Sequence, residues 1–202
     1  MDNFKYSNSF LIYLIIVSII PFLIWGPFFP DLIVSISSLF FLYFILKNNN
    51  FYFFNKKPFI IFLMFCVFSS LISLESEDIS LSINSSLFYF RIGVFSCLIW
   101  YLIDQDKSIL NFFYYAIVLS FLVLTIDGYI QYFTGINSSG FKILDNRVSS
   151  FFGNELILGS YLSRLFPLLF ALFLVKKKKK YEIYFIGLLF ILVDILIFMS
   201  GE

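Results

Sequence analysis

Seven long apolar runs, each bounded by charged or turn-forming residues, constrain this chain more than any other feature. A helix that crosses the hydrocarbon core of a bilayer needs about 17–25 apolar residues, and several of these runs lie at or just below the short end of that range. None alternates apolar and polar residues as a barrel strand does. We therefore expect an all-α, polytopic transmembrane helical bundle with about seven spans. The runs are residues 10–25, 32–46, 58–74, 87–103, 110–126, 156–175 and 183–199.

The composition supports a bilayer as the natural solvent of the chain. Of the 202 residues, 60% are hydrophobic and only 13% are charged, against about 25% charged residues in an ordinary soluble domain. This excludes a soluble enzyme, a nucleic-acid binder and a disordered segment. The chain has no histidine, which excludes histidine-based catalysis and imidazole metal ligands within it. Cys66 and Cys97 lie inside apolar runs and are expected to be packing residues.

The lysines predict the orientation of the chain. Cytoplasmic loops of membrane proteins carry an excess of Lys and Arg, and an N-terminus on the cytoplasmic side puts all lysines but Lys142 on that side. The segment between the fifth and sixth runs, residues 127–159, is then an outer loop. It holds several Gly, Asn and Ser residues together with Phe, Ile and Tyr, and we expect a surface-lying or re-entrant piece in it. The cytoplasmic lysines are Lys5, Lys47, Lys56, Lys57, Lys107 and residues 176–180.

The three arginines, Arg91, Arg147 and Arg164, depart from this pattern because they lie on the outer side or in the outer halves of the runs. The planar guanidinium binds phosphate through two hydrogen bonds, which a lysine cannot do. Three such residues suggest an anion handled at the outer surface. Arg164 lies roughly 12 Å below the outer end of its run. Snorkelling to the interface and a position facing a polar cavity are both open interpretations.

Two further groups of polar residues leave alternatives open. Asp194 is a carboxylate well inside the last run, so it needs a partner or a proton. Arg164 and Arg91 are the candidates, and a structural ion pair and a substrate contact are both open. In the outer loop, Asn154 and Glu155 are placed to cap the helix that follows. The cluster of Glu75, Glu77 and Asp78 fits either a solvated outer loop or a weak divalent-ion site.

Four stretches of the chain resemble the bacterial O-antigen ligase and O-antigen polymerase superfamily. The resemblance covers roughly residues 86–202, and the first 85 residues share only hydropathy with the family. The stretch 146–173 is fairly specific, and the other three are supportive. The stretches are SLFYFRIGVFSCLIWYLI (86–103), DGYIQYFTGINSSGF (127–141), NRVSSFFGNELILGSYLSRLFPLLFALF (146–173) and FMSGE (198–202).

The resemblance implies a glycan transferase in the bacterial cytoplasmic (inner) membrane. Such an enzyme transfers glycan from an undecaprenyl-pyrophosphate donor to lipid A core or to a growing polysaccharide, without a cofactor or metal. Flippase or chain-length-regulator proteins are the partners that such a role would allow. A flippase or transporter of the lipid-linked oligosaccharide is the alternative function. The residues implied in binding the lipid pyrophosphate or glycan are Arg91, Arg147, Arg164, Asn154, Glu155 and Gln131.

The chain departs from the family at its end. It stops at Glu202, directly after an apolar run, whereas family members have further spans and a second large periplasmic loop. In the ligases that loop carries a histidine implicated in catalysis, and this chain has none. We therefore expect these 202 residues to be the N-terminal part of a longer protein, a single transmembrane domain with part of the donor site and without a catalytic residue that the sequence can name.

Overall fold

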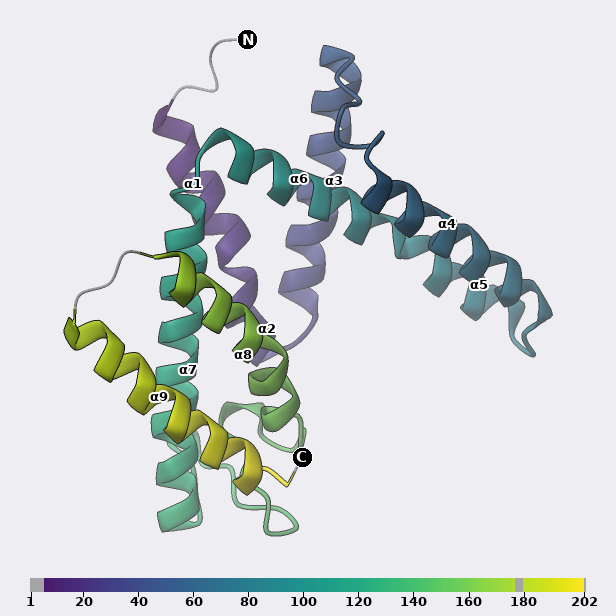
Figure 1. The fold of residues 1–202 in the computed structure, drawn as a ribbon. Helices are drawn as coiled ribbons and strands as arrows, with labels where there is room; N and C mark the ends of the chain where they lie inside the picture. Colours follow the sequence, from purple (N-terminus) through teal and green to yellow (C-terminus); the bar gives the residue numbers. More distant parts are fainter. Residues whose placement is uncertain (1–5, 177–179, 202) are drawn as a thin grey trace. The chain divides into compact units, whose positions relative to one another are not determined.

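The structure is a computed structural model that describes residues 6–176 and 180–201, and these are helical apart from loops and two isolated bridges (Figure 1). No strand is found in this part of the chain. The α-helices are α1 (Tyr6–Val17), α2 (Ile19–Trp25), α3 (Phe28–Asn48), α4 (Lys57–Ile72), α5 (Ile79–Phe88), α6 (Phe90–Gln105), α7 (Ile109–Thr134), α8 (Leu158–Val175) and α9 (Lys180–Met199), and the 3-10 turns are η1 (Ser73–Glu75) and η2 (Ser150–Phe152).

Six helical segments are long and apolar enough to cross a bilayer. The all-α fold class is confirmed, and by the length and composition of these segments the chain is a multi-pass membrane protein. All of the long helices also expose large apolar side chains such as Leu39, Met64, Leu119 and Phe198, as expected of surfaces that face lipid. The six segments are Phe28–Asn48, Lys57–Glu75, Ile79–Gln105, Ile109–Thr134, Leu158–Val175 and Lys180–Met199.

The first predicted span differs from the other six. Phe10–Trp25 forms only a shorter apolar helix, and a turn at Ser18 separates α1 from α2 within it. Pro21 lacks the N–H that would bond to the carbonyl of Val17, which weakens the helix at this point. Nearby, the hydroxyl of Ser18 donates to the carbonyl of Ile15 at 2.6 Å. That this segment also crosses the membrane stays a prediction.

The chain divides into two compact units. Unit 2, residues 28–109, contains α3 to α6, and its central contact is between α3 and α6. Asp31 and Phe44 of α3 contact Arg91 and Tyr101 of α6, respectively. The two helices therefore run in the same direction, as spans separated by one intervening span should. On α6, a Cβ at Gly93 would lie 2.5 Å from the ring of Phe62, so only glycine lets α4 pack this closely.

Unit 1, residues 1–27 and 110–202, is built around α7. Its core contains side chains of α7, α8 and α9 that are almost fully buried, including Phe121, Leu162 and Val193. Gly128 of α7 lies against Leu196 of α9, and a Cβ there would approach the leucine to 2.8 Å. α7, α8 and α9 therefore pack as one bundle in this unit (Figure 1).

The predicted outer loop begins later than the sequence suggests. α7 does not end at Ile126 but continues to Thr134, so the loop proper runs from Gly135 to the start of α8 at Leu158. Asp127 is not a helix boundary, because other residues of the loop satisfy its carboxylate inside the unit. The one helical turn of this loop is η2, and the expectation of a surface-lying or re-entrant piece stays a prediction.

Candidate functional site

The segment 135–157 folds back on the C-terminal end of α7 as an ordered loop. Ile136 bridges Lys142, and Leu144 bridges Arg147 across a two-residue turn. The turn residues Asp145 and Asn146 both have positive φ, at 50° and 58°, which is the backbone of a type I′ hairpin turn that Asp and Asn tolerate well. A short polar turn therefore shapes this part of the loop.

Asp127 is the anchor of this loop. Its side chain is only 3% exposed, yet its carboxylate accepts hydrogen bonds from four donors. Oδ1 accepts from the backbone N–H of Ser138, at 2.9 Å, and from the hydroxyl of the same residue. Oδ2 accepts from the hydroxyl of Ser150 at 2.7 Å and from the amide of Asn137 at 3.3 Å. These donors satisfy a buried carboxylate, which would otherwise be costly.

Gln131, one helical turn further along α7, holds a second part of the loop. It is completely buried, and its Oε1 accepts from the backbone N–H groups of Ser149 and Ser150 at 2.9 and 2.7 Å. Its amide nitrogen donates to the carbonyl of Phe141 at 3.3 Å. Both ends of the amide are therefore used inside the protein. The prediction that Gln131 contacts substrate does not fit this geometry, in which it positions the loop.

Ser150 shows how firmly the loop is held. Its φ is 50°, a left-handed conformation that a non-glycine residue adopts at a cost of about 1–2 kcal/mol. Its N–H, hydroxyl and carbonyl bond to Gln131, Asp127 and Asn137, respectively. Strain of this kind persists only where the surroundings over-determine the conformation, so the loop is a rigid element of unit 1.

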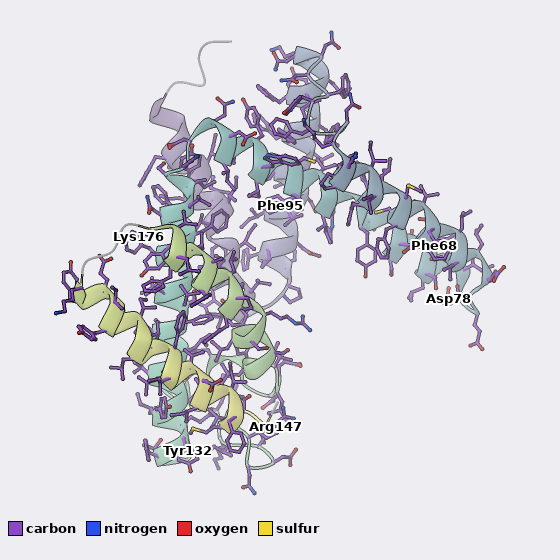
Figure 2. All side chains as sticks on the ribbon, viewed as in Figure 1. Phe68, Asp78, Phe95, Tyr132, Arg147 and Lys176 are labelled. Atoms are coloured by element: carbon purple, nitrogen blue, oxygen red, sulfur yellow. The ribbon has the colours of Figure 1, made fainter. Side chains whose placement is uncertain are left out.

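Arg147 joins the loop to the C-terminal end of α9 (Figure 2). Its Nε donates to the carbonyl of Ser200 at 2.6 Å, and the backbone N–H of the following residue, Val148, donates to the carbonyl of Met199 at 3.2 Å. Gly201 leaves the space that the arginine occupies, since a Cβ there would lie 2.8 Å from Nε. A cation at the negative end of a helix is electrostatically favourable, so part of the role of Arg147 is structural.

Arg164 lies on α8 six residues after the helix begins at Leu158. It is exposed, as is Asp194 on α9, and no ion pair of either is found among the residues that the structure describes. The predicted pairing of Asp194 with Arg164 or Arg91 is therefore not formed. Pro167 stands one turn further along α8, where its missing N–H leaves the carbonyl of residue 163 beside Arg164 without its usual helical donor.

Asn154 and Glu155 are both exposed on the loop. The prediction that they cap the next helix is wrong, because the N-cap of α8 is Ile157, which makes no side-chain capping bond. Two residues of extra loop separate the pair from the helix. Their side chains are exposed at this end of unit 1.

The third arginine, Arg91, belongs to unit 2 and has its own surroundings. Its Nη2 lies 2.9 Å from the carboxylate of Asp31, and its Nη1 donates to the hydroxyl of Ser35 at 2.8 Å. The arginine lines a pocket of about 520 Å³ between the start of α3 and the junction of α5 and α6. The other lining residues are Asp31, Asn84, Ser85, Phe88, Tyr89 and Ile92.

The structure thus groups the predicted residues into two places. Arg147, Arg164, Asn154, Glu155 and Gln131 belong to unit 1, and Arg91 belongs to unit 2. Sequence reasoning missed the polar residues that build the loop and the pocket. The signal for the loop was available, since Asp127 and Gln131 stand one helical turn apart on the same face of an otherwise apolar helix. The missed residues are Asp127, Asn137, Ser138, Ser149 and Ser150 in the loop, and Asp31, Asn84 and Ser85 in the pocket.

The acidic cluster after α4 has a structural role in part. Asp78 is the N-cap of α5, and its carboxylate accepts from the backbone N–H of Leu81 at 3.1 Å. Among the residues that the structure describes, no group of three or more acidic, cysteine or histidine side chains is arranged to hold a metal ion. This favours the solvated-loop interpretation of Glu75, Glu77 and Asp78.

The fold and these two places define a multi-pass helical membrane protein with a rigid, hydrogen-bonded loop at one end of the α7–α9 bundle. Comparison of the chain with models of known families, with curated proteins and with solved structures found no match.

Proposed function

We propose that the protein is a membrane glycan transferase that moves an oligosaccharide from an undecaprenyl-pyrophosphate carrier to an acceptor glycan. It would act as a polysaccharide or O-antigen polymerase, or as a ligase, at the outer face of the bacterial inner membrane. The observation that carries this proposal is Arg164, an exposed guanidinium inside an apolar helix with no carboxylate paired to it in the described part of the chain. A charge at the centre of a membrane helix costs about 2.5–3.5 kcal/mol, and an anionic lipid ligand would offset the part of this cost that Arg164 bears.

The neighbourhood of Arg164 supports a ligand at this end of unit 1. The loop 135–157 is held rigid by Asp127 and Gln131, and binding sites on rigid supports keep their geometry. The loop presents Asn154 and Glu155 at its surface. We assign the pyrophosphate to Arg164, with Arg147 beside the end of α9 as the second arginine of the site, and the first sugar to the exposed loop residues.

The proposed reaction breaks the bond between the anomeric carbon of the donor sugar and the pyrophosphate oxygen. The acceptor hydroxyl oxygen forms the new bond to that carbon, and its proton passes to a general base that the sequence does not identify. Undecaprenyl pyrophosphate leaves with the electron pair, and arginine stabilises the charge that develops on it. Neither a metal nor a cofactor is required by this scheme.

Binding of the donor lipid tests the proposal. We suggest native mass spectrometry of the protein in nanodiscs with undecaprenyl pyrophosphate, and with undecaprenyl monophosphate and phosphatidylglycerol as competitors. The proposal predicts preference for the pyrophosphate, and a loss of about tenfold or more in affinity on Arg164→Lys, because lysine keeps the charge but loses the two-pronged hydrogen bond. Arg147→Lys should weaken binding in the same direction.

Lys142→Arg is the matched control, since Lys142 is an exposed cation of the same loop outside the assigned site. It should bind the donor as the unmodified protein does. Equal affinity for phosphatidylglycerol and undecaprenyl pyrophosphate, or an Arg164→Lys variant with unchanged affinity, would contradict the proposed function.

A further inference from the structure

The pocket beside Arg91 in unit 2 is polar on one side and aromatic on the other. Arg91, Asp31, Asn84 and Ser85 supply the polar groups, and Phe88 and Tyr89 are exposed aromatic side chains at its edge. The guanidinium of Arg91 also lies over the ring of Phe88, at 5.5 Å from its centroid. The lining comes from three helices of one unit, α3, α5 and α6, and from Tyr89 between the last two.

The charge of Arg91 is already compensated within this pocket. The carboxylate of Asp31 lies 2.9 Å from its Nη2, and no other charged residue lines the pocket. An anion placed beside Arg91 would also lie beside Asp31, and like charges repel at this range. A pocket with no net charge suits a neutral polar ligand better than a phosphate.

The hydrogen-bonding groups of the pocket match a ligand rich in hydroxyls. A hydroxyl both donates and accepts, so a sugar ring needs donors and acceptors side by side. Arg91 and the amide of Asn84 donate, while Asp31 accepts. Ser85 donates its own hydrogen to the carbonyl of Leu81 at 2.9 Å, which leaves its oxygen to accept.

The aromatic side chains at the edge of the pocket complete the match. The faces of Phe88 and Tyr89 are apolar, and the C–H faces of sugar rings pack well on such surfaces.

We infer that this pocket binds a neutral sugar unit of the glycan, with Asp31, Arg91, Asn84 and Ser85 as its polar contacts and Phe88 or Tyr89 as its stacking surface. The inference rests on the proposed function for the identity of the glycan. It separates Arg91 from the arginines assigned to the pyrophosphate, because Arg91 is paired with the carboxylate of Asp31 in the pocket that it lines.

Saturation-transfer NMR tests the inference directly. The probes are the methyl glycosides of glucose, galactose, mannose and N-acetylglucosamine, added to the protein in nanodiscs, with inorganic pyrophosphate in a parallel phosphorus-NMR titration. We expect at least one glycoside to receive saturation and pyrophosphate not to bind at this pocket. Asp31→Asn should weaken the glycoside about tenfold, because a charged acceptor is lost, and should create pyrophosphate binding at the uncompensated Arg91.

Ser85→Ala and its control Ser96→Ala separate a loss of glycoside binding from a loss of folding. Both serines are exposed on the α5–α6 span, and each donates to the carbonyl four residues earlier at 2.9 Å, but only Ser85 lines the pocket. Ser85→Ala should lower glycoside affinity several-fold and Ser96→Ala should not, with equal helical circular dichroism and melting temperature. The absence of glycoside binding, pyrophosphate binding that Asp31→Asn leaves unchanged, or equal glycoside affinity in Asp31→Asn would overturn the inference.

These outcomes are independent of the donor-lipid experiment. A protein that binds the glycosides here but ignores undecaprenyl pyrophosphate would lose the proposed function and keep the sugar site. A protein that binds the lipid through Arg164 but no glycoside would lose only the sugar site.

Discussion

The carboxylate of Asp127 accepts a 2.7 Å hydrogen bond from the hydroxyl of Ser150, although the two residues are 23 positions apart and both are buried. This bond joins the end of a membrane-spanning helix to the far side of the loop that follows it. A buried carboxylate satisfied by hydrogen bonds fixes the loop more firmly than apolar contacts alone, because few other arrangements supply the same donors.

Asp127→Asn should destabilise this loop. The amide nitrogen of asparagine is a donor, and it would face donors from Asn137 and the two serines that now bond to the carboxylate. We expect a loss of at least about 2 kcal/mol in local stability, since hydrogen bonds to a charged group are worth about 1.5–3 kcal/mol. Hydrogen exchange of residues 135–157 measures this, and Asp145→Asn, at an exposed loop position, should leave the exchange unchanged.

Gln131→Leu tests the other anchor. The substitution keeps the size of the side chain but leaves the backbone N–H groups of Ser149 and Ser150 without their acceptor, at about 1–3 kcal/mol for each buried donor. Limited proteolysis should then cut the loop faster while the helices stay intact. Gln105→Leu, at an exposed position near the end of α6, is the control; similar cleavage in both variants would mean that Gln131 does not hold the loop.

The apolar pattern predicts the long spans but misses most of α5 (Ile79–Phe88). It also misses the helix ends and contacts that depend on distant residues. The charged residue after Ile126 predicts a helix end there, whereas α7 continues to Thr134. Only partners from the folded loop make Asp127 acceptable inside the helix. Likewise, nothing in the local sequence pairs Arg91 with Asp31, which lies 60 positions away. The sequence alone identifies the arginines as candidate site residues, but only the fold shows which residues they contact.

Lys176 lies between aromatic side chains at the end of α8 that is predicted to be cytoplasmic. The Nζ of Lys176 donates to the hydroxyl of Tyr115 at 2.8 Å and lies 4.5 Å from the ring centroid of Tyr114. The same Nζ lies 3.9 Å from Oε2 of Glu182. Burial lowers the pKa of Lys176, but the hydrogen bond to Tyr115 and the electrostatic contributions of Tyr115, Glu182 and Tyr114 together raise it above its ordinary value.

A raised pKa predicts how this site responds to pH. Its contribution to stability is complete below the lysine pKa of the unfolded chain, about 10.4, and is lost as the pH rises through the higher pKa of the folded protein. Lys176→Met should therefore lower the melting temperature at pH 8, and the difference should shrink above about pH 10.4. Lys180→Met, at an exposed position, is the control. A difference in melting temperature that grows with pH would contradict a raised pKa of Lys176.

The orientation of the chain is open to cysteine labelling. In a variant without Cys66 and Cys97, an impermeant thiol reagent added outside the cell should label Ser139→Cys and not Asn49→Cys. Ser139 lies in the loop after α7 and Asn49 directly follows α3, so an odd number of spans separates them if α4, the α5–α6 span and α7 all cross. Labelling at Asn49 but not at Ser139 would invert the predicted topology and place the arginines on the wrong side for the proposed donor.

The fate of the lipid-linked donor tests the central claim most directly. Proteoliposomes that carry the protein in the full length its gene encodes would receive an undecaprenyl-pyrophosphate oligosaccharide with a fluorescent glycan. The account predicts a longer or transferred glycan with release of undecaprenyl pyrophosphate, and strong loss of both in Arg164→Lys. Movement of the intact donor to the opposite leaflet, with the bond between sugar and pyrophosphate unbroken, would contradict the account and establish a flippase.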